Sequence, residues 1–98
     1  MNYDDFMDEI GESKEEREVI RMTARMVSDI IKRRKALGLT QEQVAKKAKL
    51  SQAQVARLEN SSQIPRVDTL LKVAIALNLN VSLTEAYEEA ATSSLAHV

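Results

Sequence analysis

The sequence contains no cysteine and no tryptophan, and its 98 residues include only one proline, two glycines and one histidine. Without cysteine there is no disulfide framework and no thiolate metal site. No apolar run is long enough for a membrane span or a signal peptide. Because helix breakers and β-branched runs are both scarce, the sequence predicts one small all-α domain, which we expect in the cytoplasm.

The chain also lacks the residue patterns of common catalytic and cofactor sites. Its one histidine, His97, lies in the C-terminal tail, and there is neither a cysteine nucleophile nor a glycine-rich phosphate loop. The neighbouring carboxylates Glu15 and Glu16 fit a solvated helix face better than an acid–base pair. No metal-ligand spacing occurs. We therefore expect no enzyme activity, no metal and no cofactor.

Charge of one sign is scarce overall, since the formal net charge is −1, but the charges are unevenly distributed. Residues 1–20 hold eight acidic and two basic side chains, and residues 21–80 hold twelve basic and four acidic ones. A basic middle segment suits a nucleic-acid partner, and an acidic N-terminal segment suits a basic protein partner. Ordinary surface charge on helices is the alternative explanation.

Two helices are predicted in the first part of the chain. The first covers about 3–10, because apolar residues recur with helical spacing at Tyr3, Phe6, Met7 and Ile10. After Gly11, Ser13 and Glu16 form a capping-box pattern that begins the second helix. It should run to about Leu37 and end at Gly38, which can adopt a left-handed C-cap.

The apolar stripe of this second helix is wider than packing on one side requires. One line consists of Val19, Thr23, Met26 and Ile30, and another of Ile20, Ala24, Val27 and Ile31, with Met22 extending the set. Together they cover roughly 200°, against about 100° for a helix buried on one side. One line can pack on the domain. The other predicts a second subunit or a different protein, unless the 3–10 helix folds back over it.

Two further capping boxes, Thr40 with Gln43 and Ser51 with Gln54, lie eleven residues apart. They predict two short helices that begin at about 41 and 52 and are joined by a tight turn at Lys49. Such a pair is typical of a helix-turn-helix.

The second helix of this pair should expose a slim, polar face with little bulk. Glutamine can form two hydrogen bonds with adenine, and arginine can do the same with guanine. Exposed amides at the start of the first helix suit a phosphate oxygen. The predicted DNA-contacting residues are Thr40, Gln41, Lys49, Ser51, Gln52, Ala53, Gln54, Arg57 and Asn60.

The C-terminal part predicts one clear helix and one uncertain element. The stripe Val67, Leu70, Leu71, Ala74 and Leu77 indicates a helix that ends near Asn78. Residues 81–84 alternate like a strand, but Ser82 and Glu85 also fit a capping box, so a final helix over about 83–91 is favoured and a strand stays open.

Residues 30–80 resemble the helix-turn-helix domain of the Cro/C1 (XRE) family of repressors. The matching residues are Arg34, Leu37-Gly38-Leu39-Thr40-Gln41, Val44-Ala45, Ala48, Ser51, Val55, Leu58-Glu59-Asn60, Pro65, Thr69-Leu70 and Ala74. The resemblance implies a five-helix domain, a phosphate contact at Gln41, and base contacts at Gln52, Ala53 and Arg57. It also implies that Arg34 and Glu59 pair as structural residues.

Two positions depart from the family pattern. The family often has glycine where Lys49 stands, and a left-handed turn would cost lysine roughly 1 kcal/mol. The loop after Asn60 lacks the basic residue that the family often has there, which indicates modest DNA affinity or dependence on dimerisation.

The whole layout is most similar to HigA-like antitoxins, in which a helical extension precedes this domain. That similarity implies an acidic extension over 1–22, a DNA-binding domain over 23–80, and a helix with a flexible tail over 81–98. It also implies a homodimer that represses its own operon at a palindromic operator, in the bacterial or phage-encoded nucleoid. The partner would be a small basic RelE/HigB-like RNase toxin, bound by Phe6, Ile10, Val19, Ile20, Met22, Met26 and Val27.

Two alternatives remain. One is a stand-alone Cro/C1-type regulator of a phage or a restriction system, in which the extra apolar line serves only self-association. The other is a protein-interaction module of the same fold with little DNA binding.

Overall fold

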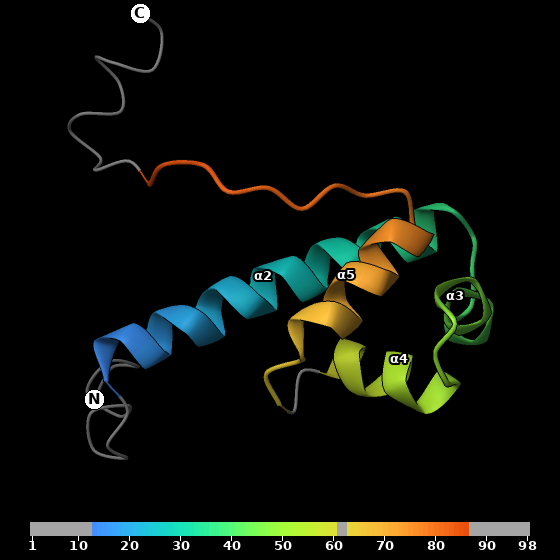
Figure 1. Cartoon of the computed structure of the whole chain (residues 1–98), viewed down its shortest axis with the longest axis horizontal. Helices are drawn as coiled ribbons and strands as arrows, with labels where there is room; N and C mark the ends of the chain where they lie inside the picture. The colour runs from blue at the N-terminus through green and yellow to red at the C-terminus, as the bar shows by residue number, and fades with distance from the viewer. Residues whose placement is uncertain (1–12, 61–62, 87–98) are drawn as a thin grey trace, which may run out of the picture.

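The structure, a computed structural model, describes residues 13–60 and 63–86. The described residues contain no strand and form four helices, α2 (Lys14–Ala36), α3 (Gln41–Ala48), α4 (Gln52–Asn60) and α5 (Val67–Ala76) (Figure 1). This confirms the all-α prediction, but not the count of five helices. The helix expected over 3–10 lies outside the described residues. No described helix is long and apolar enough to cross a membrane.

The predicted caps of α2 and α3 are present. The Ser13 hydroxyl accepts a hydrogen bond from the Glu16 amide at 3.0 Å, and the Glu16 carboxylate accepts one from the Ser13 amide at 2.7 Å. Thr40 and Gln43 make the same reciprocal pair at the start of α3. Gly38, just after α2, has a φ of 70°, a conformation that glycine adopts without strain. These bonds join residues three apart, so the local sequence sets the helix starts.

The core lies where α3, α4 and α5 pack together against the C-terminal half of α2. Val44, Val55, Val73 and Leu77 are fully buried at its centre. Its other members are Val27, Ile30, Ala45, Ala48, Leu58 and Leu70. The Arg33 guanidinium donates a hydrogen bond to the Leu77 carbonyl oxygen at 3.0 Å, which ties the end of α2 to the end of α5.

The wide apolar stripe of α2 is divided along the helix rather than around it. Val27 and Ile30 come from the two different lines, yet both are buried in the core, at 2% and 3% exposure. Val19 and Ile20, also from different lines, are 50% and 36% exposed. The reason is length, because α2 has 23 residues and its N-terminal half projects beyond α3–α5 (Figure 1). The uncovered apolar surface is therefore the N-terminal continuation of the core face.

The chain after α5 differs from the expected final helix. Asn78 has a left-handed φ of 60°, after which residues 79–86 form no helix and run back towards the N-terminal end of α2 (Figure 1). The helix predicted over 83–91 is thus absent at Leu83–Ala86, and its remainder lies outside the described residues. Leu83 is 96% exposed. A short helix that buries no apolar face lacks the packing that stabilises most protein helices.

Candidate DNA interface

A tight turn joins α3 to α4. Lys49 has a φ of 59°, the left-handed conformation in which the side chain is strained, and the Leu50 amide donates to the Ala45 carbonyl oxygen at 2.9 Å. Ser51 then caps α4, since its hydroxyl accepts from the Gln54 amide at 3.1 Å. The turn and both helix starts are therefore as the sequence predicted, with lysine at the position where the family often has glycine.

Helix α4 has one buried and one open face. Val55 and Leu58 are buried at 0% and 2% exposure. On the other side, Gln52, Ala53, Arg57 and Asn60 are exposed. Because alanine adds no bulk, this face can approach a flat or grooved surface closely. It carries the donors and acceptors that base edges in a major groove require.

Gln54 has a more limited role than expected. Its side-chain oxygen accepts a hydrogen bond from the Ser51 amide at 2.9 Å, and the residue is half-buried. The acceptor is thus engaged in capping α4. Only the NH2 group of Gln54 remains to donate outward.

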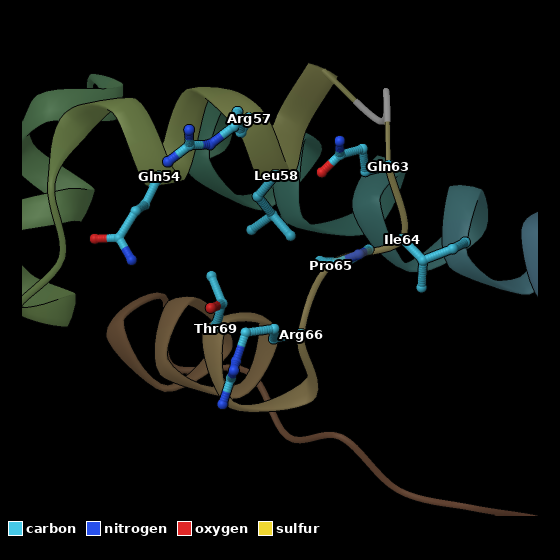
Figure 2. Close-up of a pocket in the computed structure, with 8 residues that line it drawn as sticks. All are labelled: Gln54, Arg57, Leu58, Gln63, Ile64, Pro65, Arg66 and Thr69. Atoms are coloured by element: carbon cyan, nitrogen blue, oxygen red, sulfur yellow. The ribbon is translucent and has the colours of Figure 1, made fainter.

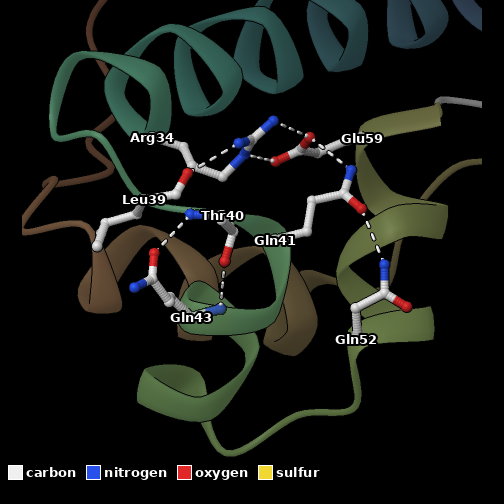
Figure 3. Close-up of polar contacts among 7 residues, drawn as sticks. All are labelled: Arg34, Leu39, Thr40, Gln41, Gln43, Gln52 and Glu59. Atoms are coloured by element: carbon white, nitrogen blue, oxygen red, sulfur yellow. Dashed lines mark hydrogen bonds and ion pairs between the residues drawn. The ribbon is translucent and has the colours of Figure 1, made fainter.

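The predicted pair of Arg34 and Glu59 forms and holds α4 to α2. The Arg34 Nε and Nη2 atoms donate to the two carboxylate oxygens of Glu59 at 2.6 and 2.9 Å (Figure 3). The Arg34 Nη1 atom donates to the Leu39 carbonyl oxygen at 2.9 Å. The two side chains are only 13% and 6% exposed. A bidentate pair of this geometry fixes the orientation of α4 relative to the end of α2.

Gln41 extends this pair into the candidate DNA-contacting face. Its Nε2 atom donates to Glu59 at 3.0 Å, and its Oε1 atom accepts from Gln52 Nε2 at 3.0 Å (Figure 3). Glu59 can only accept, so it sets the direction of both bonds. Gln52 is left with its oxygen and one N–H free, which is the pair that adenine requires.

Sequence analysis placed Gln41 at a phosphate and did not identify this link. Its signal was the spacing of the capping boxes, because Gln41 and Gln52 are the first residues of α3 and α4.

Glu59 stays ionised in this setting. Burial alone would raise the pKa of its carboxyl group, but the hydrogen bonds from Arg34 and Gln41 lower it by more, so the net shift is downward. The same pair raises the pKa of Arg34. The link between α2 and α4 is therefore a full ion pair at neutral pH.

A hollow of about 220 Å³ lies between α4 and the start of α5. Figure 2 shows Gln54 and Arg57 on its α4 side, with Thr69 and Arg66 on its α5 side. Arg66 is exposed and pairs with Asp68 at 3.1 Å. It was not among the predicted DNA-contacting residues, although a basic residue directly before a helix is a visible signal. Two arginines beside α4 give this edge the charge that suits a phosphate backbone.

The predicted partner-binding residues fall into three groups. Val19, Ile20 and Met22 are exposed on the projecting half of α2, and Met26 is half-buried. Val27 lies inside the core, so its side chain contacts this chain rather than a partner. Phe6 and Ile10 lie outside the described residues. The exposed apolar set, here called the α2 patch, is therefore Val19, Ile20 and Met22.

The described residues contain no group of three or more His, Cys, Asp or Glu side chains that could hold a metal ion.

Comparisons with known proteins agree with this architecture. The helix-turn-helix family HTH_3 matches residues 30–84, more than half of the chain. The curated proteins give no significant match. Among solved structures, a chain of a "Toxin-Antitoxin module from Streptococcus pneumoniae" is similar, with 29% identity and a TM-score of 0.64. The alignment covers 89% of this chain and 94% of that one.

This alignment extends beyond the family match. The share of the chain left out of it is smaller than the stretch that precedes residue 30, so it includes part of the N-terminal region as well as the domain. The similarity therefore concerns the whole layout. By the family match and by the geometry of α3 and α4, the chain belongs to the XRE-type helix-turn-helix family of DNA-binding regulators.

Proposed function

We propose that this chain is an antitoxin that also represses its own operon. As a homodimer it places α4 of each subunit in the major groove of a palindromic operator. The projecting half of α2 binds a small basic RelE/HigB-like RNase toxin. One observation carries the proposal, the apolar patch that α2 presents outside the core of the DNA-binding domain.

The DNA-binding half of the proposal is supported by the open face of α4. Gln52 and Arg57 are exposed there, and the Gln41 bond orients the Gln52 amide. Thr40, Lys49 and Ser51 lie at the helix starts and the turn, where family members contact the phosphate backbone. Arg57 and Gln52 contact bases, and the cations around them neutralise phosphates.

The toxin-binding half is supported by two features of α2. Val19 and Met22 are about half exposed, which is unusual for neighbouring large apolar residues of a monomer. The similarity to a chain of a toxin-antitoxin module extends into this N-terminal region. The acidic residues of segment 1–20 favour association with a basic protein.

The first experiment is the native mass of the tagged chain, gently purified from its own cells. A stoichiometric small basic protein that inhibits growth when produced alone is the expected result. A homodimer without such a partner would favour the stand-alone regulator, because the family match accounts for residues 30–84 without any toxin.

Met22→Glu tests the surface itself. It should abolish toxin binding and leave operator binding unchanged, since the α2 patch is outside the core and away from α4. Arg25→Glu, an exposed change on the same helix, is the control and alters the charge by more than Met22→Glu does. Equal binding of the toxin by wild type and Met22→Glu would assign the α2 patch to something else. A gel shift with the chain's own upstream DNA checks the second half.

A further inference from the structure

Helix α5 carries an apolar line on its outer side that no described residue covers. Val67, Leu71 and Ile75 are spaced four apart, so they form one line along the helix, and they are 69%, 37% and 74% exposed. The opposite side of α5, with Leu70, Val73 and Ala74, is buried in the core. The exposed line is therefore a second apolar surface, separate from the α2 patch.

A charged edge runs beside this line. On a helix, Asp68 and Lys72 project about 100° further round than Val67 and Leu71, and both are exposed. The outer side of α5 thus combines three apolar residues with one acidic and one basic residue, four positions apart.

We propose that this surface binds a second copy of the same chain, with the two α5 helices packed antiparallel about a two-fold axis near Leu71. The inference deepens the homodimer of the proposed function and rests on it only for the link to DNA. An isologous interface needs a surface that is complementary to itself.

The charges of α5 meet that requirement in the antiparallel arrangement. The two-fold axis keeps the charged edges of both helices on one side and reverses their direction. Asp68 then lies beside the partner subunit's Lys72, and Lys72 lies beside the partner subunit's Asp68. A parallel pair would put the two edges on opposite sides and lose both contacts. A basic toxin would find a single acid and a single base here, with no net attraction.

The shape of the surface agrees with this register. A shallow hollow of about 480 Å³ lies over the start of α5 and is lined by Arg66, Val67, Asp68 and Leu71. With Leu71 at the axis, the partner subunit's Ile75 comes opposite Val67 and enters this hollow. Ile75 is the most exposed residue of the line, so it gains most from burial.

The contact is small, which sets the expected strength. Three aliphatic side chains fall well short of the roughly 800 Å² that each partner contributes to a standard interface. We expect a dissociation constant in the micromolar range in the absence of DNA. DNA that binds the dimer strengthens the association by mass action.

The test is sedimentation equilibrium of the full chain without DNA and without other proteins, so it does not depend on the proposed function. Wild type should dimerise. Leu71→Glu should raise the dissociation constant by at least about thirtyfold, because each dimer would bury two unpaired carboxylates. Far-UV circular dichroism checks that the variant keeps its helices.

A charge exchange tests the register. Lys72→Glu should weaken the dimer by about tenfold, since it creates two like-charge contacts. The double variant Asp68→Lys/Lys72→Glu should return to within about threefold of wild type, because both pairs reform with reversed signs. Lys32→Glu, the same change on the exposed surface of α2, is the control and should have little effect.

Three outcomes would overturn the proposal. They are a monomeric wild type at about 100 μM, a folded Leu71→Glu variant that dimerises normally, and a charge exchange that fails to restore the association. If Leu71→Glu instead lost only the toxin, the partner of this surface would be the toxin and not a second copy. Operator binding is measured separately, so its absence would count against the proposed function alone.

Discussion

At the scale of single residues, Glu59 is the point where the fold and the candidate DNA interface meet. It accepts hydrogen bonds from Arg34, which belongs to α2, and from Gln41, which belongs to α3. Gln41 in turn accepts from Gln52, one of the residues expected to contact bases. An ion pair that could be mistaken for simple stabilisation therefore also sets which atoms Gln52 offers to DNA.

The lowered pKa of Glu59 predicts how stability depends on pH. The unfolded carboxyl group titrates near the ordinary value of 4.5, and the folded one titrates below it. Its contribution to the free energy of unfolding is therefore fully present above about pH 4.5 and is lost as the pH falls through the folded pKa. Urea denaturation of wild type should show a steeper loss in this window than denaturation of Glu59→Gln.

Glu42→Gln is the control for this measurement, because Glu42 is an exposed carboxylate of α3. Wild type and Glu42→Gln should have similar pH profiles. The same profile for Glu59→Gln would show that the pair contributes nothing to the acid response.

Arg57 tests base contact by the recognition face. Arg57→Ala should reduce the preference for the operator over random DNA by about 1–3 kcal/mol, since a bidentate contact with one base pair is lost. Lys46→Ala, which removes a cation from α3, should change the affinity for both DNAs by the same factor. Competition gel shifts at one fixed salt concentration measure both. If Arg57→Ala weakened binding to both DNAs equally, Arg57 would contact phosphate rather than a base.

At the scale of elements, the turn between α3 and α4 contains a local strain. Lys49 adopts a φ of 59° where glycine would be unstrained. Lys49→Gly should therefore raise the free energy of unfolding by about 1 kcal/mol. Lys47→Gly, within α3, should lower it by about the same amount, because glycine destabilises a helix interior. Opposite signs in chemical denaturation are the expected outcome, and a loss for both would mean that the Lys49 side chain contributes a contact.

Helix α2 shows what a periodicity argument can and cannot give. The residues at 19, 20, 27 and 30 were correctly identified as one broad apolar set. Helical periodicity gives an angle around the axis, so it predicted two faces with two partners. The actual division is along the axis, at the point where α3–α5 end, and no pattern within α2 encodes that point. Burial of Val27 and exposure of Val19 follow from where other helices stop.

At the scale of the whole molecule, the proposed dimer makes a geometric prediction about its operator. Two α4 helices should reach half-sites whose centres are about 34 Å apart, or a multiple of that distance. Inserting about five base pairs between the half-sites turns one of them to the far side of the DNA and should abolish cooperative binding. Inserting about ten restores the facing and should recover much of it. Binding that ignored the spacing would indicate independent monomers.

The sequence alone determined the parts of this protein that depend on residues close together in the chain. The capping boxes at Ser13, Thr40 and Ser51 join residues three apart, so their patterns predicted where α2, α3 and α4 begin. The Arg34–Glu59 pair spans 25 residues, and only the resemblance to a known family predicted it.

The tertiary structure decided what depends on distant contacts. It placed Gln41 against Glu59 and Gln52, it left residues 83–86 without a helix, and it covered only one half of α2. A capping pattern supplies a few local hydrogen bonds, whereas burial of apolar surface supplies most of the stability of a short helix. Which surfaces are buried is fixed by how all the helices pack together.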